Sequence, residues 1–119
     1  MRYLLLCLAL AACGDSPTQP TITLTGAWSG TIDGQTLYLV LSEGAGGTVT
    51  GTGSLTYPGE GGVALTVRSG THVTPNVSLV LEASGYDDTS FTGTVTASEI
   101  QAYLNGSGFL NDYVLMTRQ

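Results

Sequence analysis

Few side chains in this sequence have a type and spacing that could do chemistry, and the thiol of Cys13 is the clearest of them. Cys13 follows the small residues Ala11 and Ala12, which end an apolar run over residues 3–10, and Arg2 places a positive charge in front of that run. A charged start, a short apolar stretch and small residues before the cleavage point are typical of a secretory signal peptide. The run is shorter than the roughly 20 apolar residues that cross a bilayer, so we expect cleavage.

The stretch Leu10-Ala11-Ala12-Cys13 resembles the lipobox of bacterial lipoproteins. The resemblance implies that the Cys13 thiol receives a diacylglyceryl group, that cleavage makes Cys13 the first residue, and that its amine takes a palmitate-type chain. Two or more acyl chains hold a protein firmly to a membrane. In such lipoproteins an aspartate directly after the cysteine favours the inner membrane, and Gly14 in its place favours the outer membrane. The alternative is an ordinary signal peptide whose removal leaves Cys13 as a free thiol.

The remaining candidates for chemistry do not form a catalytic group in the sequence. His72 is the only histidine, and it falls in a segment expected to be a loop, where histidines are usually solvated. No serine lies in the setting of a nucleophile elbow. Asp87 and Asp88 could offer oxygen ligands to calcium, but they lack the alternating spacing of a calcium loop, so we interpret them as turn residues. We therefore expect no enzyme activity, no cofactor and no metal site.

Charge and cysteine usage narrow the possible partners. The chain has nine acidic residues and three arginines, and loss of Arg2 with the signal leaves two cations against nine acids, a formal charge of −7. Nucleic acid is excluded as a partner, because phosphate binding needs clustered basic residues and Arg68 lies far from Arg118 in the sequence. The lack of clustered basic residues also disfavours attraction to anionic lipid headgroups, so we expect the lipid anchor to provide the membrane contact. Cys7 lacks small residues before it and leaves with the signal, so no disulfide forms.

The chain divides into a signal peptide over residues 1–12, a lipidated cysteine and flexible tether over residues 13–25, and a β-barrel domain over residues 26–119. Apolar residues alternate with polar ones through eight segments separated by turn-forming residues, and Asp33-Gly34 predicts a tight hairpin. Eight short strands favour an all-β, antiparallel up-and-down meander, and closure into a small barrel removes its exposed edges. Glycines on the inner face would let the strands coil. The sequence does not determine which face of the last strand points inward.

The first and last strands carry a second resemblance. Gly26-Ala27-Trp28 at the start and Arg118 at the end resemble the calycin pattern of lipocalins, fatty-acid-binding proteins and avidins. The resemblance implies a barrel-closing contact in which Arg118 lies over Trp28, and it implies a barrel that binds small ligands. The predicted lining is apolar and favours a filled core over an avidin-like site; it comprises Ile32, Leu37, Leu39, Leu41, Leu55, Val63, Leu65, Val67, Val77, Leu79, Leu81, Phe91, Val95, Ile100 and Leu104.

Three functions are consistent with these observations. The first is a membrane-anchored, non-catalytic envelope lipoprotein whose outer face or loops contact another envelope protein. The second is a calycin-like carrier of a small apolar ligand, which the filled lining does not favour and which requires a cavity well above the size of one water. The third is an inhibitor of a cationic extracellular hydrolase, with Asp87, Asp88 or Glu60 at the contact. The outward positions of Tyr38, Val40, Val80 and Tyr103 would mark a partner surface if they cluster.

Overall fold

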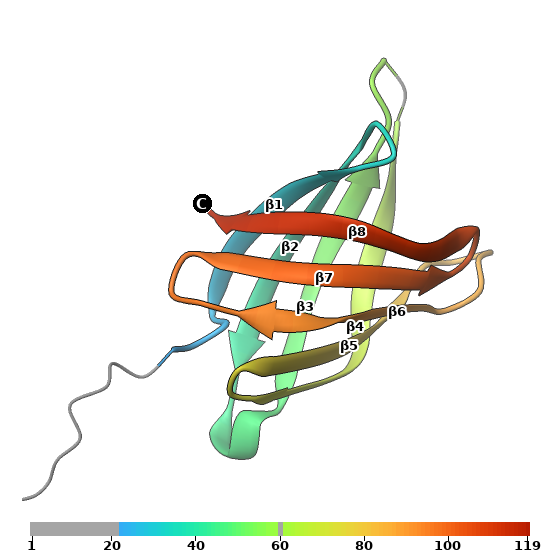
Figure 1. Cartoon of the computed structure of the whole chain (residues 1–119). Helices are drawn as coiled ribbons and strands as arrows, with labels where there is room; N and C mark the ends of the chain where they lie inside the picture. The colour runs from blue at the N-terminus through green and yellow to red at the C-terminus, as the bar shows by residue number, and fades with distance from the viewer. Residues whose placement is uncertain (1–21, 60) are drawn as a thin grey trace, which may run out of the picture.

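A computed structural model gives the fold of residues 22–59 and 61–119, and the predicted lipid-acceptor Cys13 lies outside these residues. Eight antiparallel strands follow one another around a closed barrel, and the last strand pairs with the first (Figure 1). The all-β, up-and-down closed barrel predicted from the sequence is confirmed. The strands are β1 (Gly26–Ile32), β2 (Gln35–Glu43), β3 (Val49–Thr56), β4 (Gly62–Val73), β5 (Asn76–Glu82), β6 (Thr89–Val95), β7 (Glu99–Gly106) and β8 (Phe109–Arg118), with the short 3-10 helix η1 (Ala45–Gly47) between β2 and β3.

The alternation of apolar and polar residues fixes which side chains face inward. In β2, Leu37, Leu39 and Leu41 are buried, while Tyr38 and Val40 between them are exposed. The Asp33-Gly34 turn joins β1 to β2 with both residues at positive φ, 50° and 75°, which is the backbone that a tight hairpin requires. The predicted hairpin is confirmed, and it places the β2 leucines against β1 in the core.

The fourth strand departs from the expected pattern. Residues 70–76 were expected to form a loop, but β4 runs to Val73 and only Thr74 and Pro75 separate it from β5. The register of β4 against β5 shifts between Val67 and Ser69, which adds one residue to β4. An extra residue reverses the inward and outward faces beyond it. His72 therefore points into the barrel, where it is only 6% exposed, and its prediction as a solvated loop residue is wrong.

The largest side chains of the core are Trp28 and Phe91, both fully buried. In β8, Val114 and Met116 face inward and Leu115 faces outward, which settles the face that the sequence left open. Leu24, in the segment assigned to the tether, is also fully buried and belongs to the core. Residues 22–25 thus lie against one end of the barrel.

Inner-face glycines allow neighbouring strands to approach closely. A Cβ added at Gly53 would collide with the carbonyl oxygen of Tyr38 on β2, and one at Gly93 would collide with the carbonyl oxygen of Gln101 on β7. The missing side chains therefore accommodate backbone, as expected for strands that coil sharply around a small barrel. These two glycines leave no empty space in the core.

Candidate functional site

The turns divide between the two ends of the barrel. One end carries residues 22–25, η1, the β4–β5 and β6–β7 turns and the C-terminus. The other end carries the β1–β2, β3–β4, β5–β6 and β7–β8 connections (Figure 1). We call them the closed end and the open end, because the first is covered by residues 22–25 and the second contains a cavity.

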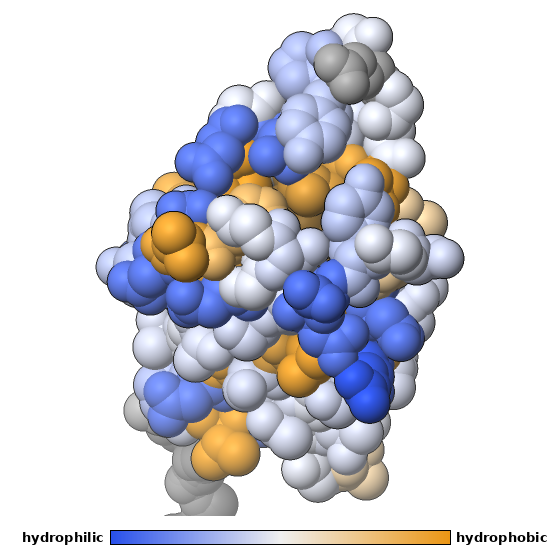
Figure 2. Space-filling view, turned by 90° about the vertical axis from the view of Figure 1, so that its right-hand side faces the viewer, coloured by the Kyte–Doolittle hydropathy of each residue, from blue (hydrophilic) through white to orange (hydrophobic). Residues whose placement is uncertain are grey.

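The cavity at the open end has a volume of about 210 Å³. A dry cavity of about 150 Å³ holds benzene, so this space admits a small organic molecule and far exceeds one water. Apolar side chains form about half of its wall, among them Leu37, Leu55, Val63, Leu65, Leu81, Leu104 and Phe109. In Figure 2, hydrophobic surface lies below the projecting β3–β4 hairpin and is bordered by hydrophilic residues. The expected filled interior is thus wrong at this end of the barrel.

The exposed fractions of the apolar lining residues show which of them lie deep in the cavity and which lie nearer its opening. Leu37, Leu81 and Leu104 are at most 2% exposed and lie toward the core. Leu55, Leu65 and Phe109 are only partly buried and pack against that core. A ligand with an apolar body would cover these partly exposed side chains and remove their surface from water, which is the usual driving force for such binding.

Gln35 and Thr89 are the buried polar residues of the cavity wall. Gln35 begins β2 on the same face as Leu37, and the residue is 8% exposed. Its Oε1 is buried and has no hydrogen-bond partner among the described residues. A buried acceptor without a partner costs about 1 to 3 kcal/mol. Because the Gln35 side chain lines the cavity, a rotation of its amide would let this oxygen accept a hydrogen bond from a bound molecule.

Carboxylates surround the same opening. Asp33 and Asp87 line the cavity, and Asp112 lies beside Asp33. A hydrogen bond shared with Asp112 raises the pKa of Asp33, and desolvation and the Asp112 charge add to that rise. Arg68 is bonded to Asp88 and does not line the cavity. The described wall therefore has acidic groups and no lysine or arginine.

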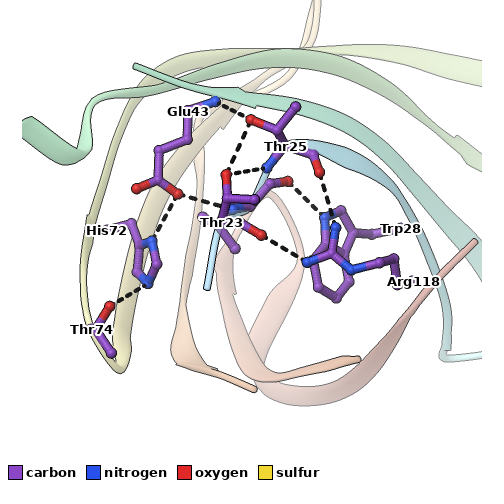
Figure 3. A network of polar contacts seen from close by, with 8 residues as sticks. Thr23, Thr25, Trp28, Glu43, His72, Thr74 and Arg118 are labelled. Carbon is purple, nitrogen blue, oxygen red and sulfur yellow. Dashed lines mark hydrogen bonds and ion pairs between the residues drawn. The ribbon is translucent and has the colours of Figure 1, made fainter. Parts of the chain in front are cut away.

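The closed end holds the predicted contact between Trp28 and Arg118. The structure brings these residues together: Arg118 Cζ lies 4.2 Å from the ring centroid of Trp28 (Figure 3). The guanidinium also donates hydrogen bonds to the carbonyl oxygens of Thr23 (2.7 Å), Thr25 (2.9 Å) and Ala97 (3.1 Å). Trp28 Nε1 donates to the carbonyl oxygen of Leu24 at 2.9 Å. Both residues therefore hold the segment before β1 across the end of the barrel.

A second polar group fixes the same segment. The Oε1 atom of Glu43 accepts a hydrogen bond from the amide of Leu24 at 2.9 Å and lies 2.8 Å from His72 Nδ1 (Figure 3). His72 Nε2 lies 3.2 Å from the Thr74 hydroxyl. Burial tends to raise the pKa of Glu43, but the Leu24 hydrogen bond and the contact with His72 outweigh it and hold that pKa below its ordinary value. Since every polar contact joins parts of the barrel end, we assign this group a structural role.

Other sequence candidates are not brought together. Tyr38 and Val40 lie on β2, Val80 on β5 and Tyr103 on β7, and none of these three strands is a neighbour of another. The predicted partner surface made of these residues does not form. Asp87 lines the cavity, whereas Asp88 is paired with Arg68. No group of three or more histidine, cysteine, aspartate or glutamate side chains within the described ranges is arranged to hold a metal ion.

Sequence reasoning missed Gln35 and Asp33 as residues of a site. The signal for Gln35 was present, because it shares the parity of Leu37, Leu39 and Leu41 and therefore faces inward. A polar residue at an inward position next to a turn marks the rim of a barrel. Asp33 was assigned only to the hairpin turn, and its place beside Asp112 depends on the closure of β8 onto β1.

Comparison of the chain with protein-family models, curated proteins and solved structures gives no match. The fold and the site nevertheless define a class: a small, closed, eight-stranded antiparallel barrel with one covered end and a cavity at the other. In the part of the chain that the structure describes, no helix has the length and apolar character needed to cross a membrane.

Proposed function

We propose that this chain is a barrel that binds a small, largely apolar molecule in its open end. The observation that carries this proposal is the cavity of about 210 Å³, whose wall includes five leucines, Val63 and Phe109. The ligand-carrier interpretation requires a cavity whose volume is well above that of one water molecule, and this cavity meets the requirement. It favours the carrier over the envelope interaction module, whose expected outer patch is split among separated strands.

The lipid anchor is a second part of the proposal. Cys13, with its lipobox-like context, would hold the protein at the cell envelope, with the outer membrane favoured by Gly14. The chain enters the barrel at the closed end through residues 22–25. The segment from Cys13 to Ile22 reaches at most about 30 Å. An anchor there would place the closed end toward the membrane and leave the open end facing away from it.

Binding is tested by titrating the full chain with 2-phenylethanol and following methyl resonances by NMR. We expect saturable shifts at Leu55 and Leu65, which line the cavity. Val63 and Ala64 offer a matched pair, because Val63 lines the cavity and exposed Ala64 follows it on β4. Val63→Trp should weaken binding at least about tenfold, whereas Ala64→Trp should change it less than about twofold. Absence of saturable shifts, or equal binding by the two variants, would contradict the proposal.

A further inference from the structure

The buried amide of Gln35 restricts the chemistry of a bound molecule. Its Oε1 lacks a hydrogen-bond partner among the described residues, and Gln35 lines the cavity. A ligand that excludes water from this part of the cavity must carry an N–H or O–H donor to satisfy this acceptor. A hydrocarbon would leave it buried and unpaired, which is unfavourable. The body of the ligand is thus apolar, and its head carries a donor.

The charges at the opening select among donor groups. Asp33 and Asp87 line the cavity, and Asp112 lies beside Asp33. Arg118 lies at the closed end, and Arg68 is paired with Asp88, the neighbour of Asp87, so this pair adds no net charge near the opening. A ligand carboxylate would meet like charges here, whereas an ammonium would meet opposite ones. Electrostatics therefore favours a cationic head.

We propose that the open end binds a small organic amine, with its ammonium group at Gln35 and Asp33 and its apolar body against Leu37, Leu55 and Phe109. This inference rests on the proposed function and adds the chemical class of the ligand. The order of the residues along β1 and β2 is consistent with it. Asp33 lies in the turn, Gln35 begins the strand below it, and Leu37 follows deeper on the same face.

The cavity volume also limits the size of the amine. A space of about 210 Å³ exceeds by a modest margin the 150 Å³ or so that suits benzene. A phenyl ring with a two-carbon arm is therefore a suitable probe, and changing only its head group isolates the effect of charge. 2-Phenylethylamine, 2-phenylethanol and phenylacetate carry a cationic, a neutral and an anionic head at pH 7.

The experiment measures the affinity of the full chain for these three probes by NMR titration. We expect 2-phenylethylamine to bind at least about tenfold more tightly than phenylacetate, with 2-phenylethanol between them. Added salt should reduce the advantage of the amine, because exposed charges are screened. Equal affinity for the amine and phenylacetate, or tighter binding of phenylacetate, would overturn the inference. Binding of 2-phenylethanol without any preference for the amine would leave the proposed function standing.

Variants assign the preference to the named residues. Asp33→Asn keeps a residue that accepts the positive φ of this turn, and it should lower the affinity for the amine about three- to tenfold. Glu82→Gln removes one exposed charge on β5 and should change that affinity less than about twofold. Gln35→Leu should weaken the amine and the alcohol, both of which carry a donor, but not phenylacetate. Thermal unfolding of each variant verifies its fold. Equal effects of Asp33→Asn and Glu82→Gln would overturn the inference.

Discussion

The guanidinium of Arg118 lies over the indole of Trp28, and the two residues are register partners where β8 closes onto β1. The same guanidinium donates to the carbonyl oxygens of Thr23 and Thr25 in the segment that leads into β1. One side chain thus joins the last strand, the first strand and the covering of the closed end. Both the contact and the hydrogen bonds stabilise closure of the barrel.

Replacement of Arg118 tests that role. Arg118→Met keeps much of the apolar stem but removes the charge and all three hydrogen bonds to backbone carbonyls. We expect the free energy of unfolding to fall by about 2 to 3 kcal/mol, measured by urea unfolding. Arg68→Met is the matched control, because Arg68 forms an exposed pair with Asp88 and should cost less than about 1 kcal/mol. Equal losses in the two variants would show that Arg118 is only a surface cation.

Trp28 is predicted to be the largest single contributor to the core at the closed end. It is fully buried, and its Nε1 donates to the Leu24 carbonyl oxygen. Trp28→Ala should lower the free energy of unfolding by about 3 to 5 kcal/mol, because it leaves a large cavity. Trp28→Phe retains most of the buried ring and should cost less. Urea unfolding measures both, and a loss below about 1 kcal/mol for Trp28→Ala would contradict the burial of this residue.

The sequence predicts the barrel well because its signals are local. Strict alternation of apolar and polar residues in β2 determines which face of the strand points inward. The Asp33-Gly34 turn determines the hairpin between β1 and β2. Closure follows from the number of strands and the cost of exposed edges. The pairing of Trp28 with Arg118 was suggested by residue types at the two ends of the domain, and it lies where β1 meets β8.

The features that sequence reasoning missed depend on irregularities or on three-dimensional neighbours. The extra residue in β4 between Val67 and Ser69 reverses the faces beyond it, so His72 is buried although the turn-forming residues between Gly70 and Asn76 predicted a loop. Leu24 belongs to the core because Glu43 and Trp28 hold its backbone. The cavity depends on how far the core side chains fill the barrel, and residue types alone do not give that depth.

The identity of the lipid-acceptor residue can be tested in cells. Cys13→Ala should abolish labelling by a clickable fatty acid and release the protein from the membrane fraction, because the anchor has no other attachment point in the proposal. Labelling is read by in-gel fluorescence and release by fractionation. Cys7→Ala is the control and should leave both results unchanged, since Cys7 lacks the preceding small residues. Membrane retention of the Cys13→Ala variant would contradict the anchor.

The stability of the closed end should depend on pH through Glu43. Its pKa lies below the ordinary value of 4.5, so the folded state favours the ionised carboxylate. A depressed pKa contributes stability that is fully present above the ordinary value and is lost as the pH falls through the folded-state value. At pH 7, Glu43→Gln should lower the free energy of unfolding by about 1 to 3 kcal/mol. The difference between the two proteins should shrink as the pH falls below 4.5.

Urea unfolding at a series of pH values measures this difference, and Glu82→Gln is its control. Glu82 is an exposed carboxylate on the outer face of β5, so its replacement should leave the pH dependence of the parent protein unchanged. The groups that face Glu43 are the Leu24 amide in the segment before β1 and the His72 ring on β4, so the carboxylate joins that segment to the barrel wall. A difference between wild type and Glu43→Gln that stays constant from pH 7 to pH 3 would contradict the assignment, because it would show that packing rather than the carboxylate charge holds this segment.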